Sequence, residues 1–334
     1  AGVLGRTPMM RLPAFRFVAP DSLQAVVDIV ADSGPRAALV AGGTDLYPNM
    51  KRRQVKPEIV VGLHNVRELA GVRRTDEGGL SIGAVSALTD LERHPLLREL
   101  YPSVVEAILT ISTPLLRNMG TIGGNVCLDT RCHFLNQTHF WRQALGSCMK
   151  ADGEICRVAT SSPRCLAISS ADLPPLLIAL GATACLVSAA GERAIPLSEL
   201  YRDEGIKCLS RAADEILTEI VLPPPDGVRA IYLKLRRRGT FDFPALGVAA
   251  AVQMNGDHSC QAARIVLGAV TSRPMEVGAA DRLVGNEMSA EAIQTVADET
   301  MQLARPLQLA DYTHSYRKKM VGLYVRRALE QLVN

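Results

Sequence analysis

Leu39-Val-Ala-Gly-Gly-Thr-Asp-Leu46 is the most informative segment of this sequence, and Thr121-Ile-Gly-Gly-Asn125 repeats its glycine pair. The first segment includes the end of an apolar run at 37–40 that predicts a short buried strand. Glycine permits positive φ and close approach of a ligand to the backbone, so that successive N–H groups can surround a phosphate. Neither segment has the spacing of a Rossmann fold or a P-loop. The pattern indicates pyrophosphate binding of another kind or, as the simpler alternative, two tight turns.

The composition around these segments is that of an ordinary globular protein. The chain has 334 residues, 48% apolar residues and a formal net charge of +3. These values exclude a disordered chain and argue against nucleic acid as the main partner. The segment 173–191 contains no charged residue, but its prolines and Gly181 predict a buried helix followed by a strand, so we expect no membrane span. No signal peptide is visible, and we expect a cytoplasmic protein.

The pattern along the chain predicts two domains. Residues 1–222 form the first, with α/β subdomains at about 1–70 and 71–222, and the proline-rich run 222–227 forms a linker. Residues 228–334 predict a sheet with helices on one side. We expect helices near 23–30, 87–92, 104–111, 175–180, 290–303 and 316–332, and strands near 37–40, 59–63, 80–84, 183–187, 230–236, 245–254 and 262–269.

The segment 126–170, called the cysteine insert below, interrupts this pattern. It is polar, it lacks a period of 2 or 3.6, and it holds five of the eight cysteines. A loop of this length needs something other than an apolar core to hold it, and without a secretory signal a metal site is a better explanation than disulfides. The spacing C-x4-C-x15-C-x7-C-x8-C fits neither a zinc ribbon nor the common ferredoxin runs. Thiolates suit zinc and iron–sulfur clusters alike, so the spacing leaves both open.

Four segments, in order, resemble the flavin subunits of the molybdenum hydroxylases. They are Ala41-Gly-Gly-Thr-Asp-Leu46, Arg117-Asn118 with the second glycine pair, Asp172-Leu-Pro-Pro-Leu-Leu-Ile-Ala-Leu180, and Lys234-Leu-Arg followed by Asp242–Val248. The resemblance covers nearly the whole chain. It implies an α+β protein in which two subdomains of the vanillyl-alcohol-oxidase type hold FAD. A C-terminal domain with a three-stranded antiparallel sheet and helices follows them.

The same resemblance implies the FAD-binding residues. Asp172 and Lys234 are expected near the isoalloxazine ring, although Asp172 also suits a helix N-cap and Lys234 suits a solvated charge on a strand. The diphosphate and ribityl groups are assigned to the two glycine segments, namely to Val40, Ala41, Gly42, Gly43, Thr44, Asp45, Leu46, Thr121, Gly123, Gly124 and Asn125.

The cysteine insert resembles that of one branch of the family, the β subunit of 4-hydroxybenzoyl-CoA reductase. The similar residues include the lead-in 124–132, Asn136-Gln137 and Trp141-Arg142. That branch carries a [4Fe–4S] cluster in the insert, which would not include Cys127 among its ligands. There are two alternatives: Cys127 is a ligand in place of Cys132, or the centre is a structural zinc ion. The arginines adjacent to the proposed ligands either stabilise the reduced cluster or are solvated. The implied ligands are Cys132, Cys148, Cys156 and Cys165, and the adjacent arginines are Arg131, Arg157 and Arg164.

The resemblance implies an electron-transfer subunit with FAD and a [4Fe–4S] cluster and no catalytic residue of its own. The complete enzyme would remove the phenolic hydroxyl of 4-hydroxybenzoyl-CoA reductively, giving benzoyl-CoA in anaerobic aromatic degradation. Its other parts would be a molybdopterin-binding large subunit and a small subunit with two [2Fe–2S] clusters, in a dimer of heterotrimers with a ferredoxin-like donor. One alternative is a molybdenum hydroxylase that oxidises an N-heterocycle or an aldehyde, and a distant one is a zinc-binding scaffold.

Overall fold

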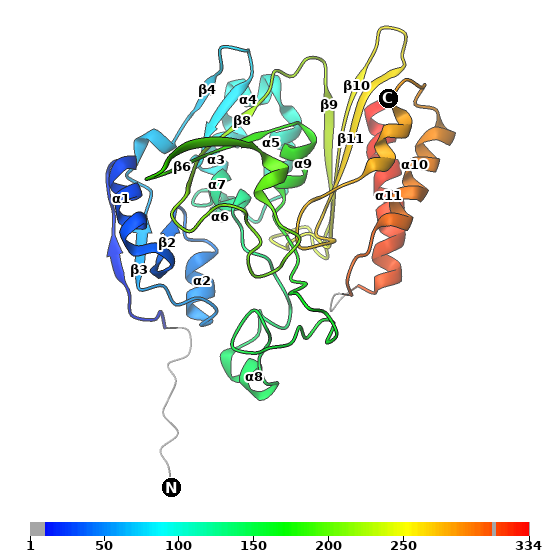
Figure 1. Cartoon of the computed structure of the whole chain (residues 1–334). Coiled ribbons are helices and arrows are strands. Elements are labelled where there is room, and N and C mark those ends of the chain that lie inside the picture. Colours follow the sequence, from blue (N-terminus) through cyan, green and yellow to red (C-terminus); the bar gives the residue numbers. More distant parts are fainter. Residues whose placement is uncertain (1–10, 309–311, 334) are drawn as a thin grey trace.

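The computed structural model describes residues 11–308 and 312–333 and contains three sheets (Figure 1). In Figure 1 the three-stranded sheet and α1 (Leu23–Ser33) lie on the left, and the C-terminal sheet lies on the right with α10 (Ala290–Leu303) and α11 (His314–Val333). Mixed helix and sheet content in separate layers confirms the predicted α+β class.

The first sheet is parallel and has the strand order β1-β3-β2. Helix α1 buries Val26, Val27 and Val30 against it, and the Ser22 hydroxyl caps the helix by accepting a hydrogen bond from the backbone N–H of Ala25. The elements are β1 (Arg16–Val18), α1 (Leu23–Ser33), β2 (Ala37–Val40), α2 (Leu46–Lys51) and β3 (Ile59–Gly62), with 3-10 turns at Gly34–Arg36 and Arg67–Leu69.

The second sheet is antiparallel and has the order β4-β5-β8-β6-β7. Its apolar face packs on short helices, two of which begin with proline, whose missing N–H costs nothing at that position. Its strands are β4 (Val72–Arg74), β5 (Leu80–Gly83), β6 (Thr183–Ser188), β7 (Gly191–Pro196) and β8 (Ile216–Leu222). The helices are α3 (Leu88–Arg93), α4 (Pro95–Leu100), α5 (Pro102–Leu109), α6 (Pro114–Arg117), α7 (Ile122–Val126) and α9 (Leu173–Ala179), with a 3-10 turn at Leu197–Leu200.

The C-terminal sheet is antiparallel, with the order β12-β11-β10-β9. It has one strand more than expected, because the two residues of β12 pair with the edge of β11. The bounds are β9 (Arg229–Leu235), β10 (Leu246–Met254), β11 (Cys260–Gly268), β12 (Met275–Glu276), a 3-10 turn at Gly278–Leu283, α10 (Ala290–Leu303) and α11 (His314–Val333).

Both faces of this sheet are buried. Its own helices α10 and α11 cover one face, as expected, and helices of the first domain cover the other. Along β10, Val248 and Val252 join the core formed with α10 and α11, whereas Ala249 and Ala251 join the core that contains α5 and α9. Alternate residues of a strand point to opposite faces, so a strand buried on both sides is apolar throughout. The C-terminal domain is therefore packed directly onto α5 and onto α9, the helix that Asp172 immediately precedes.

Most of the predicted elements are confirmed. The strand at 37–40 and the helix at 290–303 begin and end where expected, and 173–191 forms α9, β6 and the turn into β7. Strand β7 was missed because its residues are mostly exposed and have no apolar alternation. In residues 11–308 and 312–333, no helix is long and apolar enough to cross a membrane.

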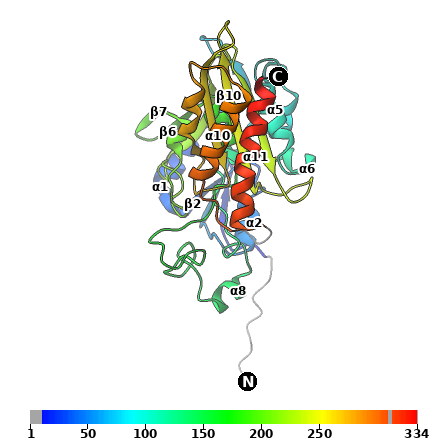
Figure 2. The ribbon, with the colours of Figure 1, turned by 90° about the vertical axis from the view of Figure 1, so that its right-hand side faces the viewer.

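The cysteine insert projects from the body of the protein (Figures 1 and 2). It contains one helix, α8 (His139–Ala144), and no strand of its own within 126–170. Two backbone hydrogen bonds of 2.8 Å between Arg131 and Ile168 close the base of the insert and form a narrow neck. Cys132 and Cys165 both lie within the insert, close to this neck and on the two chain segments that form it.

Candidate functional site

The two glycine segments meet in space. A Cβ atom on Gly42 would lie 1.6 Å from the carbonyl oxygen of Met119, just before the second segment. Gly43 has a φ of +69°, and it alone among the four predicted glycines has a positive value. Gly123 is needed for close packing, because its Cβ would lie 2.6 Å from the carbonyl oxygen of Ala84. The expectation of positive φ therefore holds for Gly43 alone. At Gly42 and Gly123 the requirement for glycine comes from close contact with another stretch of backbone.

The second segment is the start of helix α7 and not a tight turn. The Thr121 hydroxyl caps the helix by accepting a hydrogen bond from the Gly124 N–H at 3.1 Å. The Asn125 side chain accepts a hydrogen bond of 3.1 Å from the backbone N–H of Leu173, at the start of α9. The segment thus ties two helices together beside the first glycine segment.

Asp45 links the first glycine segment to the cysteine insert. Its carboxylate accepts hydrogen bonds from Arg131 Nη1 at 2.7 Å and from Asn49 Nδ2 at 2.8 Å. The Arg131 guanidinium also lies 4.2 Å from the ring centroid of Phe243, in the C-terminal domain. Three distant segments of the chain therefore meet at this arginine, which is not a solvated charge. Around Asp45, Val40 is buried at the end of β2, Leu46 begins α2, Ala41 is half-buried and Thr44 is exposed.

Asp172 and Lys234 form a buried ion pair with an N–O distance of 2.9 Å, and their side chains are 4% and 2% exposed. The Asp172 carboxylate also accepts a hydrogen bond from the Tyr232 hydroxyl at 3.1 Å, and the Lys234 ammonium donates to the carbonyl oxygen of Thr110 at 3.0 Å. Burial raises the pKa of Asp172 and lowers the pKa of Lys234, while the pairing opposes both shifts. Asp172 does stand at the N-cap position of α9, but its side chain makes no capping hydrogen bond. The alternative of a solvated Lys234 is wrong, because its side chain is buried.

The four cysteines implied as ligands, Cys132, Cys148, Cys156 and Cys165, line one small cavity in the cysteine insert. Cys127 does not line it, and the side chains that act on its pKa include Arg211. The donor set suits a centre held by four thiolates. Within the described part of the chain, however, no group of three or more His, Cys, Asp or Glu side chains stands close enough together to hold a metal ion.

Two thiols of this cavity, those of Cys132 and Cys165, are hard to ionise. Burial raises the pKa of Cys132, and it raises the pKa of Cys165 to about 11, while the neighbouring thiols add to both shifts. The positive charge of Lys150 acts in the opposite direction on Cys165. A metal centre here would have to displace these protons, because the thiolate is the ligand.

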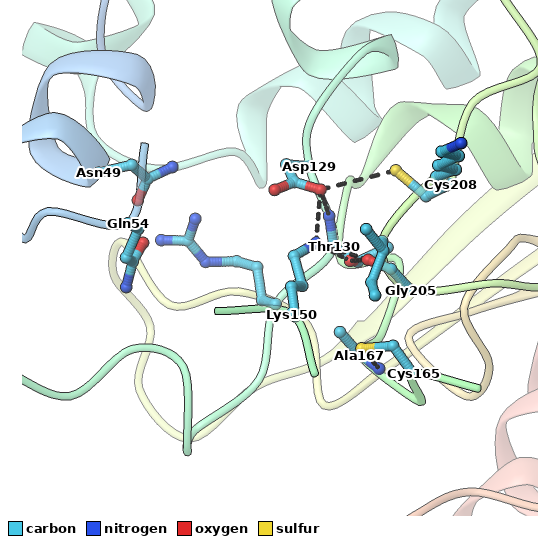
Figure 3. Close-up of polar contacts among 12 residues, drawn as sticks. Asn49, Gln54, Asp129, Thr130, Lys150, Cys165, Ala167, Gly205 and Cys208 are labelled. Carbon is cyan, nitrogen blue, oxygen red and sulfur yellow. Dashed lines mark hydrogen bonds and ion pairs between the residues drawn. The ribbon is translucent and has the colours of Figure 1, made fainter. Parts of the chain in front are cut away.

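A short loop before Cys208 packs against the same cavity (Figure 3). The Gly205 N–H donates to the carbonyl oxygen of Cys165 at 3.0 Å, and a Cβ on Gly205 would lie 2.7 Å from Cys165 Sγ. Glu204 Oε1 accepts a hydrogen bond from the backbone N–H of Cys165 at 3.3 Å. Sequence reasoning missed this loop, since a glycine 40 residues from a cysteine carries no local signal of contact.

A larger cavity, of about 320 Å³, lies between the cysteine insert and the C-terminal domain. Its lining includes Arg131, Cys132, Ser170, Phe243 and Ala245, so it borders both the four-cysteine cavity and the segment that leads to Asp172. The volume is within the range of sites for small molecules. The cavity therefore lies where the cysteine insert, the segment before Asp172 and the C-terminal domain meet.

Comparison with known proteins decides the family. Residues 13–225 match the model described as FAD binding domain in molybdopterin dehydrogenase, and residues 230–332 match the CO dehydrogenase flavoprotein C-terminal domain. The chain belongs to the FAD-binding subunits of the molybdenum hydroxylases. The predicted FAD-binding fold with its C-terminal domain is confirmed, and this flavoprotein is a subunit of an oxidoreductase.

Individual relatives span most of the flavoprotein. It is 27% identical over 327 residues to the 6-hydroxypseudooxynicotine dehydrogenase complex subunit alpha of Paenarthrobacter nicotinovorans, covering 97% of this chain and 96% of the relative. It is 30% identical to the aldehyde oxidoreductase FAD-binding subunit of Escherichia coli, covering 81% and 85% of the two chains. A solved carbon monoxide dehydrogenase structure from Hydrogenophaga pseudoflava superposes with a TM-score of 0.80 at 27% identity, covering 97% and 98%.

Removal of one partner of the buried ion pair should destabilise this flavoprotein. We expect Lys234→Met to lower the free energy of unfolding at pH 7 by about 3–5 kcal/mol, because the Asp172 charge is left buried and unpaired. Without the lysine the pKa of Asp172 rises further. The folded state then binds more protons than the unfolded state above about pH 4, so the loss of stability grows as pH rises. Urea unfolding between pH 4 and pH 7 measures both effects.

The double variant Asp172→Leu/Lys234→Met is the matched control. It leaves no unpaired charge, and we expect it to be more stable at pH 7 than Lys234→Met alone. A single variant as stable as the double variant at pH 7 would show that the carboxylate does not depend on its lysine.

The backbone contact at Gly42 predicts the effect of one methyl group on FAD binding. Gly42→Ala must separate the two glycine segments, since no Cβ can remain 1.6 Å from an oxygen atom. We expect the dissociation constant for FAD to rise at least tenfold, about 1.4 kcal/mol, in fluorescence titration of the apoprotein. Gly278→Ala is the control, because nothing lies within 4 Å of its Cβ position. Wild-type affinity in Gly42→Ala would contradict the role assigned to the contact.

Proposed function

We propose that this chain is an electron-transfer subunit that carries FAD and a [4Fe–4S] cluster. The observation that supports the second cofactor most strongly is the convergence of Cys132, Cys148, Cys156 and Cys165 on one cavity. They come from positions spread over 34 residues of a loop that has no apolar core of its own. Ligand bonds to a metal centre supply the cohesion that such a loop otherwise lacks.

Within this proposal, the chain's own residues bind and orient the flavin. The glycine segments bring two stretches of backbone close enough to follow a diphosphate, and the cap at Thr121 holds the second stretch in place. The pair of Asp172 and Lys234 offers a hydrogen-bonding edge of fixed orientation, because both side chains are buried and held by further partners. FAD supplies the exchange of one or two electrons, and the protein supplies its position and electrostatic surroundings.

In this proposal the cysteine insert holds the cluster. Arg131 connects it to the flavin side, since its own hydrogen bond reaches Asp45 and the next residue along the chain is Cys132. A cluster in this cavity would therefore lie one residue from an arginine that contacts the first glycine segment. Such a connection favours a role in passing single electrons to or from the flavin over a purely structural role.

For the complete enzyme we propose reductive removal of the phenolic hydroxyl from 4-hydroxybenzoyl-CoA, which consumes two electrons and two protons and gives benzoyl-CoA and water. The support is the resemblance of the insert. This chain would contribute no catalytic residue. It would assemble with a molybdopterin-binding large subunit and a small subunit with two [2Fe–2S] clusters, as a dimer of heterotrimers in the cytoplasm, and receive electrons from a ferredoxin-like donor.

A second candidate is oxidation of an aldehyde or an N-heterocycle by an enzyme of the same family. The Escherichia coli relative, whose name includes aldehyde oxidoreductase, favours it. The substrate pocket would lie on the large subunit in either case, so assay of the complex decides. We expect the anaerobically purified complex, supplied with reduced viologen, to convert 4-hydroxybenzoyl-CoA to benzoyl-CoA, measured by chromatography. Turnover of aldehydes or N-heterocycles alone would favour the second candidate.

The ligand assignment predicts opposite results for two cysteine variants. Cys156→Ser removes a cavity-lining thiolate and should abolish bound iron and acid-labile sulfide. Cys127→Ser changes a thiol outside the cavity and should keep both. Iron, sulfide, zinc and FAD are measured per chain on anaerobically prepared protein, and FAD should be present in both variants.

The same measurement tests the alternatives. Zinc without acid-labile sulfide in the wild-type chain would replace the cluster by a structural zinc ion. Loss of iron in Cys127→Ser, with retention in Cys132→Ser, would exchange the roles of these two residues.

A further inference from the structure

Lys150 carries a buried positive charge at the edge of the four-cysteine cavity. It lies two residues after Cys148 and lines the cavity itself. Its side chain is 7% exposed, and its ammonium group donates to Asp129 Oδ1 at 2.7 Å, to Thr130 Oγ1 at 2.5 Å and to the carbonyl oxygen of Gly205 at 2.6 Å. Figure 3 shows these groups converging on one side of the lysine.

The charges around Lys150 are unequally screened. Its partner Asp129 is 45% exposed, so water screens the carboxylate far more than it screens the ammonium group. Asp129 also shares its Oδ1 atom with the Thr130 N–H at 2.8 Å and the Cys208 thiol at 3.6 Å. A positive charge that is buried, with a counter-charge that is partly in water, leaves a net positive potential inside the cavity.

Two arginines near the cavity differ from Lys150 in their surroundings. Arg164 is adjacent to Cys165, but its side chain is 39% exposed and pairs with Asp203 at 2.7 Å. Arg157 lines the cavity and donates through Nε to the carbonyl oxygen of Ser147 at 2.7 Å. Lys150 combines a compact charge with nearly complete burial, and three oxygen atoms hold it in place.

We propose that Lys150 raises the reduction potential of the iron–sulfur cluster by holding a positive charge beside its thiolate ligands. The inference rests on the proposed function, since it needs the cluster. One-electron reduction adds a negative charge to the cluster, and a nearby fixed cation stabilises that form more than the oxidised one. Lys150 is a positioning residue in this role: it forms no bond to the iron and gives up no proton. Asp129 acts against it by cancelling part of its charge.

The test is a dithionite titration of the full chain, in which dithionite supplies the electron and the EPR signal of the reduced cluster gives the midpoint potential. Lys150→Met keeps the length of the side chain and removes the charge. We expect the equilibrium constant for reduction to fall about tenfold, which is about 59 mV for one electron. Lys150→Arg keeps the charge, so it should shift the midpoint potential less than Lys150→Met does.

Asp129→Asn is the complementary variant, because it keeps the Oδ1 acceptor and removes the counter-charge. We expect the potential to shift in the opposite direction, upward. Arg164→Gln removes an equal charge that is exposed, and should shift the potential less than Lys150→Met. A purely structural role for Lys150 would change cluster content and stability in the variants without these opposite shifts.

The outcomes separate the two levels of the proposal. A wild-type chain without iron and labile sulfide refutes the proposed cluster, and the role of Lys150 with it. A loaded wild-type chain whose Lys150→Met variant has an unchanged potential overturns the role of Lys150 alone. If Lys150→Met does not retain its cluster, Asp129→Asn decides: a raised potential supports the inference, and an unchanged or lowered one overturns it.

Discussion

The contact between the backbone of Gly42 and that of Met119 is the constraint on which the rest of the site depends. It brings a loop of the parallel three-stranded sheet against the short helices that lie on the antiparallel five-stranded sheet. A side chain of any size at Gly42 would force these two layers apart. Because the layers touch here, Asp45 comes within reach of Arg131, and the cysteine insert acquires its connection to the first glycine segment.

Buried and half-buried charges occur where the layers join. Asp172 and Lys234 connect α9 to the C-terminal sheet, Asp45 and Arg131 connect the first glycine segment to the cysteine insert, and Lys150 connects the insert to the loop at Gly205. Removing a charge from water is costly, so each of these groups depends on its partners being held in place. The same partners make the charges informative about function, because they fix an electrostatic potential at the edges of the cavities.

The cysteine insert is built differently from the rest of the protein. Apolar cores hold the three sheets, whereas the insert has a single short helix and is closed by two backbone hydrogen bonds at its neck. Gly205, Glu204 and Lys150 fasten its ends through hydrogen bonds. A loop of this kind gains stability from a bound centre more than a packed domain does, which agrees with four thiols facing one cavity.

Local patterns in the sequence determined most of the secondary structure, since periods of 2 and 3.6 record which face of a strand or helix is buried. The strand at 37–40, the helix at 290–303 and the glycine pairs follow from neighbouring residues alone. Tertiary structure decided that Lys234 is buried against Asp172, that Thr121 caps a helix, that Cys127 stands apart from the four cavity-lining cysteines, and that Lys150 is enclosed. Each of these facts depends on contacts between residues far apart in the chain or on the course of the backbone. Burial of a charge or a thiol results from those contacts and is not set by the residue type.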